Sequence, residues 1–150
     1  MSDEAPIEQE PAEVPGPPVV LVVEDDMLTR KAVARRLQME GYEIVAVPSA
    51  ADALIAAQRM SFHVLVLDLN LVGDDDPFGG LHEGFAMLDW LKLQIGDTST
   101  FRIVIHTSQG GPKILAKAEA SGVFAFCTKR RDLSALARCV AEAVDSLRAA

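Results

Sequence analysis

The sequence has few cysteines and no long apolar run. Its two cysteines, Cys127 and Cys139, are too few for a disulfide framework and lie in a predicted strand and a predicted helix, so we expect reduced, buried thiols. No apolar run approaches the roughly 20 residues that a membrane-spanning helix needs, and the amino terminus lacks the basic and then apolar order of a signal peptide. We therefore expect a soluble, cytoplasmic protein that does not contact membranes.

Basic residues are missing from the first 18 positions. This stretch, MSDEAPIEQEPAEVPGPP, holds five acids and five of the eight prolines, with almost nothing apolar to bury. It predicts a disordered acidic, proline-rich tail over residues 1–18, followed by one domain over residues 19–150. Removing the five acids from the total charge of -8 leaves -3 for the domain. Neither part has the basic excess typical of nucleic-acid binding, so we expect no nucleic-acid partner.

From Val19 onward, short apolar runs alternate with amphipathic segments. Strands are predicted over 19–23, 43–47, 63–69, 102–106 and 124–127. Helices are predicted over 26–40, 49–60, 84–95 and 112–121, with a last helix that Asp132 caps. Each connection is too long for a hairpin, so the strands should pair in parallel. The sequence therefore predicts an α/β fold, a doubly wound five-stranded parallel sheet with helices on both faces.

Polar side chains follow four of the predicted strands. They are Glu24, Asp25 and Asp26 after the first strand, Asp68 after the third, Thr107 and Ser108 after the fourth, and Lys129 after the fifth. Ligands bind such sheets at the carboxyl ends of the strands, so these groups should converge. Crowded acids repel one another unless a cation intervenes, and Mg²⁺ (or Mn²⁺) prefers oxygen ligands. A carboxylate held there can attack phosphorus as a nucleophile, with Lys129 and Thr107 stabilising the transferring charge.

Four segments together resemble a known family. LVVEDD with Arg30, VLVLDLN, IVIHTS and FAFCTK resemble, in order, the signatures of bacterial two-component response-regulator receiver domains of the CheY-like kind, and the resemblance covers residues 19–148. It implies a flavodoxin-like (βα)5 fold with strand order 2-1-3-4-5. It also implies that Asp26, one position too late for the acidic pair, begins the first helix.

The resemblance also implies a role for each site residue. Asp68 would be the phospho-acceptor; Asp25 a direct metal ligand; Glu24 a ligand through water; Asn70 a ligand through its backbone carbonyl; Thr107 and the Ser108 backbone N–H the phosphoryl-binding groups; and Lys129 their cationic partner. Phe126 takes the family's aromatic switch position, whose rotamer follows the Thr107 hydroxyl. An aromatic residue in a central strand is also an ordinary core residue, so both interpretations of Phe126 stand.

The sequence departs from the family in three places. The segment LNLVGDDDPFGGLHEG, which follows Asp68, is about twice the usual length, and its acids Asp74, Asp75 and Asp76 either serve the site or form a solvated surface loop. Arg130 replaces the proline that usually follows the lysine, so we expect a trans Lys129–Arg130 peptide. The chain ends with the last helix, so we expect a stand-alone regulator without an output module.

We therefore expect Asp68 to receive a phosphoryl group from a histidine kinase or a phosphotransfer protein. Output should pass to a downstream protein through the face built by helix 112–121, strand 124–127 and the last helix, or by phosphorelay. No turnover is expected beyond Mg²⁺-dependent self-phosphorylation and dephosphorylation of Asp68, whose phospho-form lifetime Asn70 and Gln109 should affect. Two alternatives stay open: a docking module independent of phosphorylation, and a phosphatase of the haloacid dehalogenase type, which requires an Asp where Asn70 stands. His63, His82 and His106 lack metal-binding spacing and are interpreted as structural.

Overall fold

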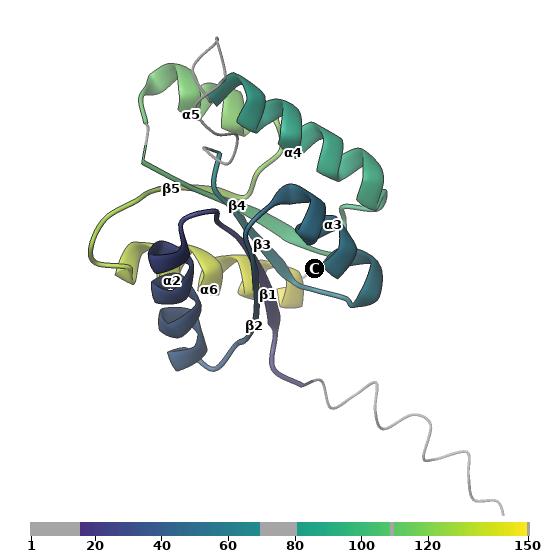
Figure 1. The fold of residues 1–150 in the computed structure, drawn as a ribbon, viewed down its shortest axis with the longest axis vertical. Helices are drawn as coiled ribbons and strands as arrows, with labels where there is room; N and C mark the ends of the chain where they lie inside the picture. Colours follow the sequence, from purple (N-terminus) through teal and green to yellow (C-terminus); the bar gives the residue numbers. More distant parts are fainter. Residues whose placement is uncertain (1–15, 70–80, 109, 150) are drawn as a thin grey trace, which may run out of the picture.

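The computed structural model describes residues 16–69, 81–108 and 110–149, with five strands and five helices in alternation (Figure 1). The strands are β1 (Val19–Val23), β2 (Glu43–Val47), β3 (Val64–Leu67), β4 (Arg102–Thr107) and β5 (Ala125–Thr128). The helices are α2 (Met27–Met39), α3 (Ala50–Arg59), α4 (Leu81–Ile95), α5 (Pro112–Ala120) and α6 (Ser134–Ala149). Residues 1–15 of the predicted tail, and Asn70, Asp74–Asp76 and Gln109, lie outside the described residues.

The five strands form one parallel sheet in the order β2-β1-β3-β4-β5. In register, Val23 of β1 lies beside Leu67 of β3, and Leu67 lies beside Ile105 of β4. All four residues of β3 are buried, as expected for a central strand covered on both faces. The predicted flavodoxin-like fold is therefore confirmed, and β1, β3 and β4 are neighbours.

Alternation along the strands divides the core into two layers. Val20 and Val22 pack with Leu37 of α2 and Val140 of α6 on one face. Leu21 and Val23 belong to the other layer, with residues of α3, α4 and α5 (Figure 1). This period of two is what a strand imposes, because successive side chains point to opposite faces. Helices cover the two faces of the sheet, so the loops that carry the polar residues lie at the edge formed by the carboxyl ends of the strands.

Polar side chains cap the amino-terminal ends of helices, largely at the positions that the sequence predicts. Asp26 Oδ2 accepts the Thr29 N–H at 2.8 Å, which confirms that Asp26 begins α2. Ser49 caps α3 in the same way, and Asp132 Oδ1 accepts the Ser134 N–H at 2.9 Å at the start of α6. Gly41, with φ of 97°, ends the turn after α2 in the left-handed region. Local capping chemistry thus determines these boundaries.

The start of α4 differs from the prediction. The helix begins at Leu81 rather than near Gly84, so Gly84 lies inside it. A Cβ at this position would lie 2.1 Å from the Leu69 carbonyl oxygen, so the glycine permits a close approach of the helix to the backbone after β3. Gly84 therefore marks a backbone contact near Asp68 and not a helix boundary.

Three further predictions concern the described chain. None of its peptide bonds is cis, so the Lys129–Arg130 peptide is trans as predicted. Cys127 and Cys139 are both free thiols, the first buried and the second half-buried. Among the described helices, none combines the length and the apolar character needed to cross a membrane.

Candidate functional site

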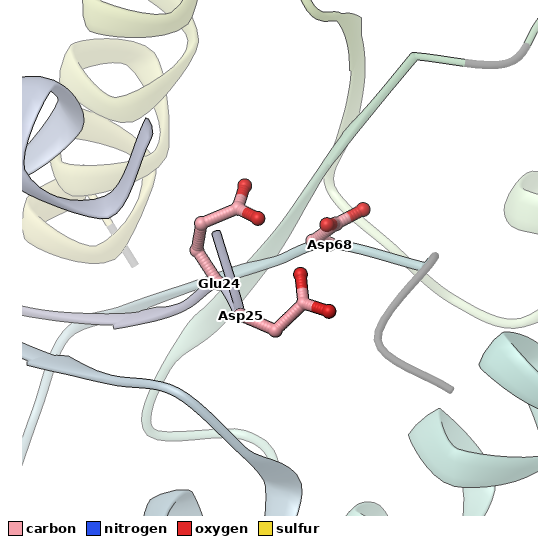
Figure 2. A group of neighbouring side chains, drawn as sticks. All are labelled: Glu24, Asp25 and Asp68. Atoms are coloured by element: carbon pink, nitrogen blue, oxygen red, sulfur yellow. The ribbon is translucent and has the colours of Figure 1, made fainter. Parts of the chain in front are cut away.

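Three carboxylates converge where β1 and β3 end side by side. Glu24 follows β1, Asp68 follows β3, and each is almost fully buried, with exposed fractions of 2% and 3%. Asp25 is exposed at the mouth of the cluster. One carboxylate oxygen from each residue lies within 4.8 Å of the other two, and Figure 2 shows the three groups around a common space. The sheet thus brings Asp68 to two adjacent acids that precede it by 43 and 44 residues in the chain.

Lys129 reaches this cluster from β5 across β4. Its Nζ lies 2.7 Å from Glu24 Oε1 and 3.0 Å from Asp68 Oδ2. The Lys129 backbone N–H donates to the Thr107 carbonyl at 2.7 Å, which fixes the start of the lysine loop to the end of β4. A single ammonium group therefore bridges two buried carboxylates.

The charges of the cluster are not balanced by Lys129 alone. Burial raises the pKa of Glu24 to about 7, while the hydrogen bond to Lys129 lowers this pKa and the charge of Asp68 raises it. Burial works against the charged form of Lys129, but its bonds to Glu24 and Asp68 outweigh burial and raise its pKa. Three carboxylates thus face one ammonium, and the pKa of Glu24 stays raised, mainly through burial and in part through the charge of Asp68. This all-oxygen donor set fits a hard divalent cation such as Mg²⁺.

Arg30 has a role that its position in the sequence did not reveal. Its Nη1 donates to the Glu24 carbonyl at 2.9 Å and, in a longer contact, to the Asp25 carbonyl at 3.4 Å. The guanidinium therefore holds the backbone of the loop that carries both acids. In the sequence, Arg30 is only part of the first motif, and no local pattern predicts this contact with the backbone.

Thr107 and Ser108 lie at the end of β4, as predicted. Thr107 is fully buried and pairs in register with Thr128, whereas Ser108 is exposed. Phe126 lies beside Ile105 and packs, half-buried, against the layer of α3, α4 and α5. His106, one residue before Thr107, is buried, and burial together with the charge of Lys129 lowers its pKa to about 4, against the opposing effect of Asp68. A neutral, buried histidine agrees with its interpretation as structural.

Comparisons with known proteins agree with this geometry. The sequence matches the family model of the response regulator receiver domain over residues 20–141. It is 30% identical, over 86% of this chain, to the transcriptional regulatory protein GlrR of Escherichia coli (strain K12). This chain spans only 27% of the length of that relative.

Solved structures share the fold. A CheY-like receiver domain protein from Methanospirillum hungatei JF-1 superposes with a TM-score of 0.73 at 18% identity, covering 89% of this chain and 98% of that one. The response regulator protein TrrA from Thermotoga maritima, solved in complex with Mg²⁺ and BeF, gives a TM-score of 0.66 at 18% identity, with 84% and 98% covered. With the family match over most of the chain, and acids and a lysine gathered at the carboxyl edge of the sheet, this protein belongs to the response regulator receiver domain family of two-component signalling.

Proposed function

We propose that Asp68 is the residue that accepts the phosphoryl group in this receiver domain. Accepting such a group is the general function of the family, and receiver domains interact with histidine kinases or phosphotransfer proteins. One observation carries the assignment: the buried Asp68 carboxylate lies 3.0 Å from Lys129 Nζ, and its oxygens lie within 4.8 Å of those of Glu24 and Asp25. No other cluster of three or more acids, histidines and cysteines with this geometry is found in the described chain.

The acids have separate tasks in this proposal. Asp25 and Asp68 would hold the divalent cation directly, Glu24 would hold it through water, and Asn70, outside the described residues, would add its backbone carbonyl. The Mg²⁺ and BeF in the complex of the Thermotoga maritima regulator support the choice of ion. When bound, the cation supplies positive charge to the carboxylates and to the phosphoryl oxygens. The donor is a phosphohistidine of the kinase or phosphotransfer protein. An Asp68 oxygen attacks its phosphorus, the bond from phosphorus to the imidazole nitrogen breaks, and the electron pair leaves with the imidazole.

Groups from β4 and β5 stabilise the transferred charge. Lys129, already beside Asp68, pairs with a phosphoryl oxygen, while the Thr107 hydroxyl and the Ser108 backbone N–H bind the others. Movement of Thr107 toward the phosphoryl group then opens space for Phe126, which biases an existing equilibrium between two states. Output passes through the face of α5, β5 and α6 to another protein in the cytoplasm, and hydrolysis of phospho-Asp68 resets the domain.

Intact-mass measurement after incubation with acetyl phosphate tests the proposal. Wild-type protein with Mg²⁺ should gain the mass of one phosphoryl group, and protein with EDTA should not. Asp68→Asn should abolish the adduct, whereas Asp52→Asn, which removes an exposed acid of α3, should keep it. An adduct that persists in Asp68→Asn would refute the assignment of the acceptor. Absence of any adduct would favour a docking module, and repeated turnover of a generic phosphate ester would favour a phosphatase.

A further inference from the structure

A groove beside the phosphoryl site has no assigned role. It has a volume of about 250 Å³ and runs between the first half of α2 and the loop before α6. Its lining residues are Leu28, Thr29, Ala32, Val33, Arg130, Arg131 and Leu133. Leu28 is 73% exposed, so it offers the groove an apolar surface that no other part of the described chain covers. Because Arg130 directly follows Lys129, the groove adjoins the proposed phosphoryl site.

The groove lies on a basic face of an acidic chain. Half of the 14 lysines and arginines are on α2 or between residues 130 and 138: Arg30, Lys31, Arg35, Arg36, Arg130, Arg131 and Arg138. The pKa of the Asp132 carboxyl is lowered by its hydrogen bonds to Ser134 and further by two charges, those of Arg36 on α2 and Arg138 on α6. Arg36 of α2 and Arg138 of α6 therefore both lie near Asp132, beside the groove. A ligand for this groove should combine negative charge with apolar side chains.

The first 15 residues of the chain have this chemistry. They carry Asp3, Glu4, Glu8, Glu10 and Glu13, with no lysine or arginine. Ile7 stands between two of these acids, and Val14 follows the last of them. We call residues 1–15 the acidic segment. Its charge is complementary to the basic face, and Ile7 supplies an apolar side chain for the exposed Leu28.

The exit point of the chain puts the groove within reach. The Pro18 carbonyl accepts the Glu43 N–H at 2.9 Å, so the chain enters β1 close to the turn that follows α2 (Figure 1). The 13 residues of α2 span about 20 Å, which is the distance from this turn to the groove end of the helix. Ile7 precedes Gly16 by nine residues, enough for about 30 Å when extended. Tethering at this length keeps the segment at a millimolar effective concentration.

We propose that the acidic segment docks in cis on this groove, with Ile7 against Leu28 and Leu133 and its acids facing Arg130 and Arg131. Docking requires no phosphorylation, so the inference goes beyond the proposed function and does not depend on it. Any partner that uses the groove must then displace the acidic segment. The segment would act as an intramolecular competitor next to the phosphoryl site.

Amide NMR spectra of the full chain test the docking. The wild type is compared with a variant in which the five acids are neutralised by Asp3→Asn, Glu4→Gln, Glu8→Gln, Glu10→Gln and Glu13→Gln. Outside the substituted segment itself, shift differences should be confined to residues 27–33 and 130–134. They should fall at least about threefold between 0.01 M and 1 M salt, because the screening length shortens from about 30 Å to about 3 Å.

Charge reversals locate the contact. Arg130→Glu with Arg131→Glu in the wild type should remove these differences. Arg59→Glu with Lys113→Glu, a matched reversal of exposed residues on α3 and α5, should preserve them. A peptide of residues 1–15 added to the neutralised full chain should shift the same amides. Unchanged groove amides, shifts over another surface, or shifts that vanish on dilution, which indicate a second copy as the occupant, would each overturn the proposal.

Discussion

Replacing Glu24 by glutamine should change the way in which stability depends on pH. The Glu24 side chain is only 2% exposed, and burial, with the charge of Asp68 and against the bond to Lys129, raises its pKa from 4.5 to about 7. A carboxyl with a higher pKa in the folded state binds its proton more tightly there than in the unfolded chain. The free energy of unfolding of the metal-free protein should therefore decrease as pH rises through this window, with no penalty below 4.5 and the full penalty above 7.

The size of the effect follows from the shift. A difference of 2.5 pKa units, from 4.5 to about 7, corresponds to about 3 kcal/mol at 1.36 kcal/mol per unit. Glu24→Gln removes this titrating group, so its stability relative to the wild type should improve by about 3 kcal/mol between pH 4 and pH 8. For a chain of this size, that amounts to roughly 6–12 °C in Tm.

Urea denaturation in EDTA at several pH values provides the assay, with circular dichroism as the signal. Glu119→Gln, which removes an exposed carboxylate of α5, corrects for the general loss of one negative charge. Parallel stability curves for wild type and Glu24→Gln across the pH range would refute the reasoning. They would mean that water or a positive charge offsets the cost of burying the Glu24 carboxylate in the folded protein.

Three further expectations concern the same edge of the sheet. Lys129→Met should destabilise the protein by about 3–5 kcal/mol at pH 8, because it leaves two buried carboxylates without their ammonium partner. The loss should be smaller at pH 5, and the same urea series measures both values. Mg²⁺ should raise the midpoint of thermal unfolding more at pH 8 than at pH 5, because the pKa of Glu24 is about 7 and this carboxyl must lose its proton when the cation binds. Calorimetry of the wild type and of Asp68→Asn checks this, and an equal rise in the two proteins would count against the metal site. Gly84→Ala should destabilise by about 1–3 kcal/mol, because the new Cβ meets the Leu69 carbonyl at 2.1 Å, whereas helix propensity alone would stabilise by about 1 kcal/mol; the sign of the measured change decides between them.

Much of the fold could be predicted from local patterns. The bounds of β2 are those predicted, and Asp26 and Ser49 cap the helices that follow them, because strand periodicity and capping depend on residues adjacent in the chain. The start of α4 was predicted wrongly at Gly84, since a glycine in a helical pattern looks like a boundary. Only the packing of α4 against Leu69 explains why a glycine is needed there.

By itself, the sequence determined which side chains stand at the ends of the strands, and the resemblance of its four motifs predicted Asp68 among them as the acceptor. The tertiary structure decided what surrounds that residue. Lys129 lies 61 positions away and meets Asp68 and Glu24 only because β5 follows β4 and β4 follows β3 in the sheet. The same is true of Glu24 and Arg30. The burial and the raised pKa of Glu24, and the hydrogen bond from Arg30 to the Glu24 carbonyl, depend on residues that are neighbours only in the folded chain. Desolvation and Coulomb energies are set by these distances, which no local pattern contains.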